Sequence, residues 1–225
     1  MGREILIRQE IIDRVMERRG RLHLYDRLDP RRTALVVIDM QNAFVAPGAP
    51  VEVPAARAIV KDINRLAREL RKRGVAVIWV LHENSGGWDG FFGVFVKPEA
   101  RVAASKALSA GHELQKPWRE LDVAAGDLKV TKNRYSALIG QSSPLADVLR
   151  KKGIDTLLIA GTKTNVCCEC TARDAMMLDY KVVMLSDCTA ALSDDEHRAT
   201  LENMIQQFGD VLTADEALAL LKEGQ

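Results

Sequence analysis

The stretch TALVVIDM, residues 33–40, decides what kind of fold this chain adopts. It is a short apolar run rich in β-branched residues, which is typical of a strand buried on both faces of a parallel sheet. Asp39 lies at the end of this apolar run. Four further strand patterns follow along the chain, at VAVIWVLH (75–82), DLKVTK (127–132), TLLIAG (156–161) and KVVMLSD (181–187).

Segments with helical periodicity separate these strand patterns. In the segment from about 53 to 73, apolar residues recur on one helical face, and Gly74 marks a plausible end of the helix. Further helices are expected over 143–152, 166–179 and 194–208. Repeated strands and helices with short connections indicate right-handed crossovers. The sequence therefore predicts a three-layer α/β/α fold with a mainly parallel sheet covered by helices on both faces.

The chain before this repeating pattern has a different character. Residues 3–19 mix charges of both signs with apolar residues at helical spacing, namely Ile5, Ile12, Val15 and Met16. We therefore expect an N-terminal amphipathic helix and arm over 1–32, packed on its own core or on a neighbouring subunit. The rest of the chain, 33–225, is expected to form one α/β domain.

Composition restricts the classes of partner. With 32 basic and 31 acidic residues the net charge is +1, so no global field attracts nucleic acid or an anionic membrane. A small molecule is the expected partner. We find no signal-peptide pattern and no apolar run long enough to span a bilayer. The four cysteines crowd into residues 167–188 instead of spreading out as a disulfide scaffold would, which favours a reducing, cytoplasmic location.

Residues 83–118 interrupt the alternation of strands and helices. They show no strong strand or helix pattern, and they contain five of the eleven aromatic residues of the chain. Long irregular segments inside compact domains are usually functional or mobile. Two interpretations stay open: the segment is a substrate lid, or its aromatic side chains cap the core or an oligomer interface.

Three chemically active residues fall at the ends of predicted strands. Asp39, Lys132 and Cys167 each lie at or just after the carboxyl end of such a strand, where open α/β sheets bind their ligands. An isolated aspartate or lysine at a strand end is more often a helix cap or a surface charge. The combination of a carboxylate, an ammonium and a thiol points to nucleophilic catalysis.

The surroundings of Cys167 fit a nucleophile. Gly161 leaves the preceding strand, and Thr164 or Asn165 is expected to cap the following helix. A thiol in the first helical turn faces the positive end of the helix dipole, and Lys132 would further stabilise its thiolate. Asp39 would take the thiol proton and hand it to a departing amine, and backbone N–H groups of the turn would bind an oxyanion.

The motifs VVIDMQNAF, KNRYSAL and GTKTNVCCECTARDAM, followed by YKVVMLSDCTAA, resemble the isochorismatase-like cysteine hydrolases, notably N-carbamoylsarcosine amidases and ureidoacrylate amidohydrolases. The resemblance covers roughly residues 33–212. It implies a catalytic triad of Asp39, Lys132 and Cys167. It also implies a cis peptide at Thr162-Lys163 and an oxyanion hole made by the backbone N–H groups of Lys163 and Cys167.

The resemblance carries further expectations about ligands and assembly. LHENSGGWDG, residues 81–90, lacks the histidine pattern of the metal-dependent nicotinamidase branch, so neither a metal nor another cofactor is expected. For His82 a local hydrogen bond is favoured over direct catalysis. A homo-oligomer, either a dimer or a tetramer, is expected. The residues predicted to line the substrate pocket are Phe44, Trp88, Phe92, Tyr135 and Asn165.

Three rival functions compete with this interpretation. Cys167 and Cys170 have the C-x-x-C spacing of thiol-redox or zinc proteins, but a second pair of metal ligands is missing from the sequence. A non-catalytic binding protein would not need all three reactive residue types. Isochorismate hydrolysis cleaves a vinyl ether and does not require a cysteine. The sequence therefore favours cleavage of a C–N bond in a small amide, ureido or carbamoyl compound through a thioester.

Overall fold

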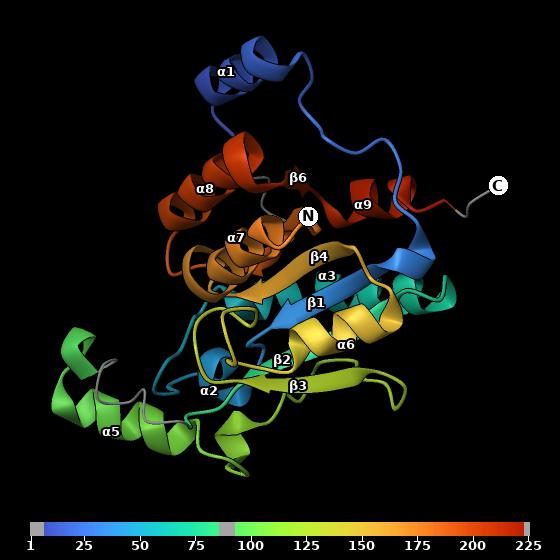
Figure 1. Cartoon of the computed structure of the whole chain (residues 1–225). Helices are drawn as coiled ribbons and strands as arrows, with labels where there is room; N and C mark the ends of the chain where they lie inside the picture. Colours follow the sequence, from blue (N-terminus) through green and yellow to red (C-terminus); the bar gives the residue numbers. More distant parts are fainter. Residues whose placement is uncertain (1–6, 86–92, 223–225) are drawn as a thin grey trace.

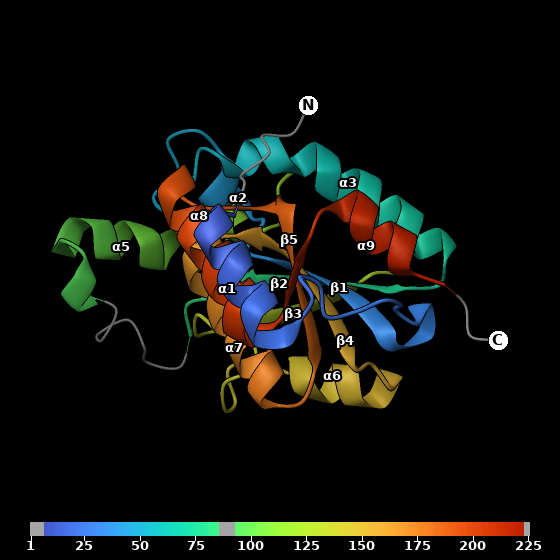
Figure 2. The same cartoon turned by 90° about the horizontal axis from the view of Figure 1, so that it is seen from above.

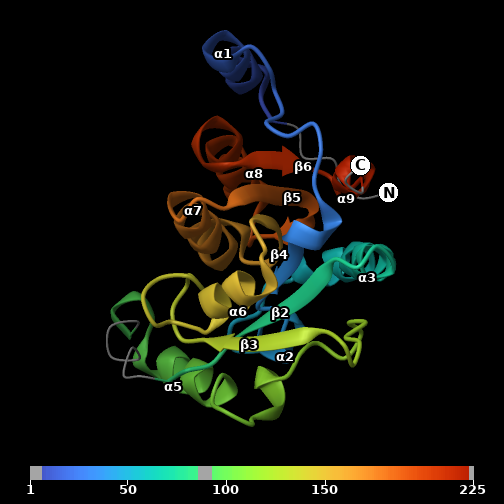
Figure 3. The same cartoon turned by 45° about the vertical axis from the view of Figure 1, so that its right-hand side comes forward.

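A computed structural model describes residues 7–85 and 93–222 and has the predicted three-layer α/β architecture (Figure 1). Its sheet has six strands, all parallel, in the order β3-β2-β1-β4-β5-β6 (Figure 3). The strands are β1 (Thr33–Ile38), β2 (Ala76–His82), β3 (Leu128–Lys132), β4 (Thr156–Thr162), β5 (Lys181–Ala190) and β6 (Asp210–Leu212).

Alternation along the central strands divides the core into two apolar layers. Leu35 and Val37 of β1 face one layer, while Val36 and Ile38 face the other. The first layer packs against α3 (Ala56–Lys72) and α9 (Ala214–Leu220), which lie side by side in Figure 2. The second layer packs against α6 (Leu145–Lys152), α7 (Glu169–Met177) and α8 (Asp194–Asn203).

Some elements differ from the sequence-based expectations. β6 and α9 were not predicted, because a strand of three residues and a helix of seven are too short for a clear periodic signal. The helix expected over 166–179 begins as a π-helical turn, η4 (Thr164–Cys168), and only then continues as α7. The helix expected over 194–208 ends in a second π-helical turn, η5 (Met204–Phe208).

The segment 83–118 is less irregular than its sequence indicates. It contains the ten-residue helix α5 (Pro98–Ala107) and two short 3-10 turns, η2 (Gly93–Phe95) and η3 (Glu113–Gln115). The expectation of an irregular segment was therefore wrong for α5. Only two of its residues, Ala104 and Ala107, are buried, so the helix has almost no apolar stripe by which the sequence could reveal it.

The N-terminal helix packs on its own chain. The helix α1 (Gln9–Arg19) lies above α8 in Figure 1 and buries Ile11 and Val15, whereas Met16 of the predicted apolar face is 43% exposed. Arg8, just before the helix, donates to the buried carboxylate of Glu202 over 2.6 Å. The arm that follows is fixed by Asp210, which accepts from the backbone N–H of Leu24 over 2.7 Å.

Strand order places the carboxyl ends of β1 and β4 where the winding of the sheet reverses. The chain proceeds outward from β1 to β2 and β3, and then returns to pair β4 with the other side of β1. The two connections leave the sheet in opposite directions there, which opens a crevice at the carboxyl edge. Two further short elements, η1 (Pro30–Arg32) and α2 (Asn42–Val45), flank β1. Within the described residues, no helix combines the length and the apolar character needed to cross a bilayer.

β1 and β4 approach so closely that Gly161 has no space for a side chain. Its φ is +110°, and a Cβ built there would lie 2.0 Å from the backbone oxygen of Ile38. We expect Gly161→Ala to lower the free energy of unfolding by about 3 kcal/mol or more, measured by urea denaturation. Gly126→Ala is the control, since a Cβ at Gly126 would have no other atom within 4 Å. Equal stability of the two variants would contradict this account.

Candidate active site

Asp39 is the first residue after β1 and its backbone turns sharply there. Its φ of 53° lies in the left-handed region, which few non-glycine residues other than aspartate and asparagine adopt readily. Its backbone N–H donates to the carbonyl oxygen of Val80 over 2.9 Å, so the turn is anchored to β2. The side chain is completely buried at the carboxyl edge of the sheet.

Lys132, the last residue of β3, reaches Asp39 across the intervening strand. Because β2 lies between β3 and β1, the backbones of β3 and β1 are two strand spacings apart, roughly 10 Å, and the long lysine side chain can close this gap. Its Nζ donates to Asp39 Oδ2 over 2.9 Å, to His82 Nδ1 over 3.1 Å and to the carbonyl oxygen of Arg134 over 3.1 Å. All three protons of the ammonium are thereby used, which is what a fully buried cation requires.

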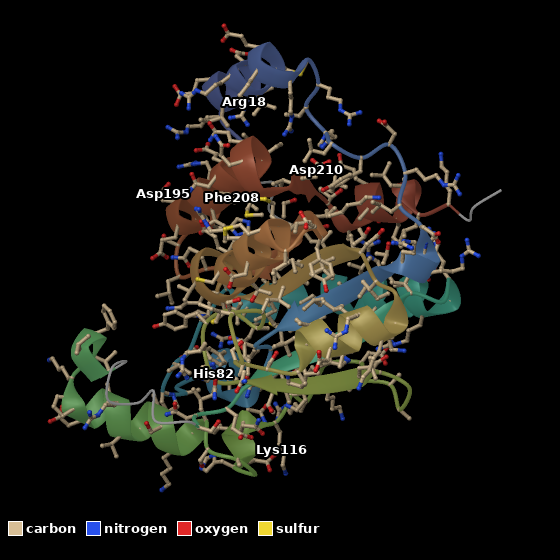
Figure 4. All side chains as sticks on the ribbon, viewed as in Figure 1. Arg18, His82, Lys116, Asp195, Phe208 and Asp210 are labelled. Carbon is tan, nitrogen blue, oxygen red and sulfur yellow. The ribbon has the colours of Figure 1, made fainter. Side chains whose placement is uncertain are left out.

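His82, at the end of β2, completes this arrangement. It pairs in register with Lys132, and Figure 4 shows it near the α5 end of the molecule, far from the labelled Phe208. Burial, together with the nearby Lys132 and Arg134, lowers the pKa of His82 well below the usual value, so its neutral ring accepts a hydrogen bond from Lys132 at Nδ1. The side-chain amide of Gln41 binds both backbone polar groups of His82, over 2.7 and 2.9 Å.

Charge and burial act in opposite directions on the ion pair. Burial raises the pKa of Asp39 above that of an ordinary aspartate, although attraction to the Lys132 ammonium opposes this effect. Burial alone would lower the pKa of Lys132, but attraction to Asp39 and Cys167 outweighs it, and the pKa of Lys132 is raised. Lys132 is therefore a permanent cation, and Asp39 is a stronger base than an exposed aspartate.

Cys167 lies in the π-helical turn η4, between β4 and α7. The turn follows the cis peptide Thr162-Lys163, which the resemblance predicted and the structure confirms. The expected side-chain cap by Thr164 or Asn165 was wrong: the N-cap residue is Lys163, and no side chain caps the turn. The Thr164 hydroxyl contacts His197 instead, because the π turn leaves it facing α8.

Cys167 and the adjacent Cys168 point in different directions. Cys167 lines a cavity, whereas the Cys168 thiol faces the backbone of β4, with its Sγ 3.8 Å from the carbonyl oxygen of Ala160. This separation agrees with the turn of about 100° between successive helical positions. All four cysteines of the chain are free thiols.

Burial and the neighbouring charges shift the pKa of the Cys167 thiol in different directions. Burial raises its pKa far above that of an ordinary cysteine, and the negative charge of Asp39 raises it further, while Lys132 acts in the opposite direction. Lys132 thus lowers the pKa of the thiol, as the sequence predicted, but desolvation and the neighbouring carboxylate outweigh this effect. Within residues 7–85 and 93–222, Asp39 Oδ1 is buried without a hydrogen-bond partner of ordinary geometry, and the Cys167 thiol adjoins this carboxylate, so an acceptor is available for the thiol proton.

A cavity of about 370 Å³ opens above Cys167, a volume that suits a small molecule. Asp39 and Lys132 do not line it and lie behind the thiol. Predominantly apolar side chains form its walls, and they come from α2, α5, η4 and the loop around residue 50. The residues are Phe44, Pro50, Val51, Glu52, Val53, His82, Asn84, Phe95, Val96, Ala104, Leu108, Tyr135, Lys163, Val166, Cys167 and Leu192.

The residues predicted to line the pocket have different positions. Phe44 and Tyr135 are in the wall of the cavity. Asn165 is not in the wall, and its Oδ1 is buried with no hydrogen-bond partner among the described residues. Trp88 and Phe92 lie outside the described residues. Sequence reasoning missed Ala104 of α5, because that helix was not recognised, and it did not single out Asn84, which lies just after β2.

Fold and site together define a doubly wound α/β enzyme with a thiol at the floor of a cavity that accommodates a small molecule. Over residues 7–85 and 93–222 no three histidine, cysteine, aspartate or glutamate side chains gather in an arrangement that could hold a metal ion. The family model described as isochorismatase domain matches residues 33–216. The chain therefore belongs to the isochorismatase family of hydrolases.

Individual relatives agree with this assignment. The chain is 33% identical over 207 residues to the ureidoacrylate amidohydrolase RutB of Caulobacter vibrioides, covering 83% of this chain and 89% of that protein. A cysteine hydrolase from Pseudomonas syringae pv. phaseolicola superposes with a TM-score of 0.80 at 30% identity, covering 89% and 96% of the two chains. The N-carbamoylsarcosine amidase from Thermoplasma acidophilum has a TM-score of 0.66 at 26% identity, covering 82% and 97%.

The buried ion pair predicts a stability effect. Lys132→Met leaves the Asp39 carboxylate buried without its cation, so we expect the free energy of unfolding at pH 7 to fall by about 3–5 kcal/mol. Urea denaturation measures this loss. Lys129→Met, at an exposed position of the same strand, is the control and should change stability by less than about 0.5 kcal/mol.

The pH dependence of the Lys132→Met variant has a defined sign. Loss of the ammonium raises the pKa of Asp39 in the folded state further above its unfolded value of about 3.9. The unfolded state then ionises first as pH rises, so stability falls between the unfolded and folded pKa values and levels off above the latter. Asp39→Asn in the same background should remove this slope. A slope that persists would mean that Asp39 is not its source.

Proposed function

We propose that this protein is a cysteine hydrolase that cleaves a C–N bond of a small amide, ureido or carbamoyl compound and releases ammonia or an amine. The observation that carries the proposal is the Lys132–Asp39 ion pair, buried directly behind the thiol of Cys167 at the floor of the cavity. The amidohydrolase names of two relatives in the family support the reaction class.

Asp39 acts as the base in the first step. The sulfur of Cys167 attacks the substrate carbonyl carbon while its proton passes to the carboxylate of Asp39, whose raised pKa suits proton abstraction. A neutral thiol is thus activated only as substrate is attacked. The Lys132 ammonium stays in place throughout and stabilises the negative charge while it moves from carboxylate to sulfur and on to the carbonyl oxygen.

Backbone groups and Asp39 complete the reaction. In the proposal, the N–H groups of Lys163 and Cys167 bind the oxyanion of the tetrahedral intermediate. Asp39 then returns its proton to the nitrogen of the leaving group, so the C–N bond breaks and a thioester remains on Cys167. Water, deprotonated by the same carboxylate, hydrolyses the thioester and restores the thiol. These steps require no cofactor.

The thiol at the cavity floor also bears on the alternative reaction of this family. Cleavage of a vinyl ether by protonation and addition of water has no need of a sulfur nucleophile. Cys167 is the cysteine that lines the described cavity, and the ion pair adjoins it. A covalent mechanism uses this arrangement, whereas vinyl-ether hydrolysis leaves it without a role. We therefore favour C–N cleavage.

The proposal predicts that one cysteine carries the activity. Screening ammonia release over a panel of small ureido compounds, amides and carbamates identifies a substrate. Cys167→Ala should then reduce kcat/KM by at least about 10⁴-fold while the protein remains folded, because the nucleophile is lost. Circular dichroism monitors folding. Cys168→Ala, whose thiol faces β4, should retain activity.

A covalent intermediate provides a second test. Rapid quenching during turnover, followed by peptide mass spectrometry, should find the added acyl mass on the peptide that contains Cys167. Site assignment by fragmentation distinguishes Cys167 from Cys168 and Cys170. Turnover by Cys167→Ala, or an acyl group on any other residue, would refute the mechanism.

A further inference from the structure

The charged side chains that line the cavity are unequally engaged. The Glu52 carboxylate accepts from Arg57 Nη1 over 2.8 Å and from the backbone N–H of Gly48 over 2.8 Å, so its charge is already compensated. His82 is neutral, as described above. Among the described residues of the wall, Lys163 is the remaining cationic side chain.

Lys163 has no counter-ion in the described part of the chain. It is half-buried at the cavity wall, and no carboxylate of residues 7–85 or 93–222 lies within ion-pair distance of it. Most side chains of the cavity wall are apolar and cannot accept a hydrogen bond from it. An ammonium at the wall of a mostly apolar cavity, without a counter-ion of its own, gains most from an anion that arrives with the ligand.

We propose that the Lys163 side chain recognises an anionic group of the substrate. The proposal rests on the proposed function and narrows it: the substrate is a small amide, ureido or carbamoyl acid whose carboxylate pairs with Lys163 while its carbonyl carbon lies over Cys167. The bound substrate displaces water from the cavity, so this pair is screened less than one on the open surface.

Matched substrates test this inference. We would measure kcat/KM for N-carbamoyl compounds of equal length that end in a carboxylate, a methyl ester or an ammonium group. For the wild-type protein the ratio of carboxylate to ester should exceed about 10. Lys163→Met should reduce this ratio at least about tenfold, and Lys163→Glu should shift the preference to the ammonium compound. Comparing the ratio of kcat/KM values for two substrates removes any effect that the substitution has on the turnover of both, such as a distortion of the turn that holds Cys167.

The controls separate this inference from the proposed function. Lys129→Met, an exposed lysine away from the cavity, should leave the ratio unchanged. A sulfonate analogue shows whether any anion suffices. If the wild type shows no preference for the acid, or if the ratio is the same in Lys163→Met, the inference fails even though Cys167-dependent turnover continues. If no compound of the panel is turned over by a Cys167-dependent reaction, the proposed function fails.

A separate observation concerns His197, a buried residue of α8 that the proposed reaction does not use. Its Nε2 lies 3.1 Å from the carbonyl oxygen of Ser186, which can only accept, so Nε2 carries the proton. Burial lowers the pKa of His197, which keeps the ring neutral. Its Nδ1, 2.8 Å from Thr164 Oγ1, therefore accepts a hydrogen bond from the threonine.

The geometry points to His197 as a positioning residue for the nucleophile. Thr164 is the first residue of η4, the turn that holds Cys167 three positions later. Through its two ring nitrogens, His197 ties this turn to the backbone of β5 at Ser186. The inference rests on the proposed function, because the geometry it maintains is that of the attacking sulfur.

Two substitutions separate the two bonds of His197. The Oδ1 of an asparagine can replace Nδ1 as the acceptor for Thr164, whereas the Nε2 of a glutamine can replace only the donor to Ser186. We expect His197→Gln to lower kcat at least about tenfold with little change in KM, and His197→Asn to retain most of it. Thr164→Val should reproduce the loss, and the double variant with His197→Gln should add nothing further.

Thr200, a buried threonine of α8, provides the control. Thr200→Val removes a hydrogen bond of 2.7 Å to Glu169 and should leave kcat within about twofold. Equal kcat for His197→Gln and His197→Asn, or additive losses in the double variant, would refute the positioning role. Turnover by Cys167→Ala would instead count against the proposed function.

Discussion

The buried contact between Lys132 and Asp39 is the interaction on which the site depends. Taking both charges out of water is costly, and the protein lowers this cost by giving each proton of the Lys132 ammonium an acceptor: Asp39, His82 and the carbonyl oxygen of Arg134. Such a pair requires three parallel strands whose ends stay in register. The all-parallel sheet fixes that register, so fold and chemistry are coupled through one ion pair.

The same burial determines when the sulfur becomes reactive. A thiolate next to Asp39 in a desolvated site is unfavourable, which raises the pKa of Cys167 above that of an ordinary cysteine. In the proposed reaction the thiol proton passes to Asp39 as the sulfur attacks, so the negative charge shifts from the carboxylate to the sulfur. The Lys132 ammonium lies beside both groups and stabilises this charge throughout. This arrangement couples nucleophile formation to attack on a bound carbonyl, and it limits side reactions of an otherwise reactive thiol.

The walls of the cavity around the thiol come from separate parts of the chain, and no sequence pattern indicates that these parts lie together. α2 supplies Phe44, α5 supplies Ala104, and the loop after β5 supplies Leu192. The turn η4 supplies the thiol, and Lys163 immediately precedes that turn. Reactive residues thus sit on the rigid sheet edge and its first turn, while shape and charge preference come from elements that can vary without disturbing the core.

The sequence by itself determined the five main strands, the parallel α/β class and the placement of Asp39, Lys132 and Cys167 at strand ends, because apolar periodicity and strand-end positions are local properties. It did not reveal α5 or β6, which lack a periodic signal. Only the tertiary structure decided that His82 supports Lys132, that Thr164 binds His197 instead of capping the helix, and that burial raises the pKa of Cys167. These properties depend on burial and on neighbours far away in the chain, which no local pattern encodes.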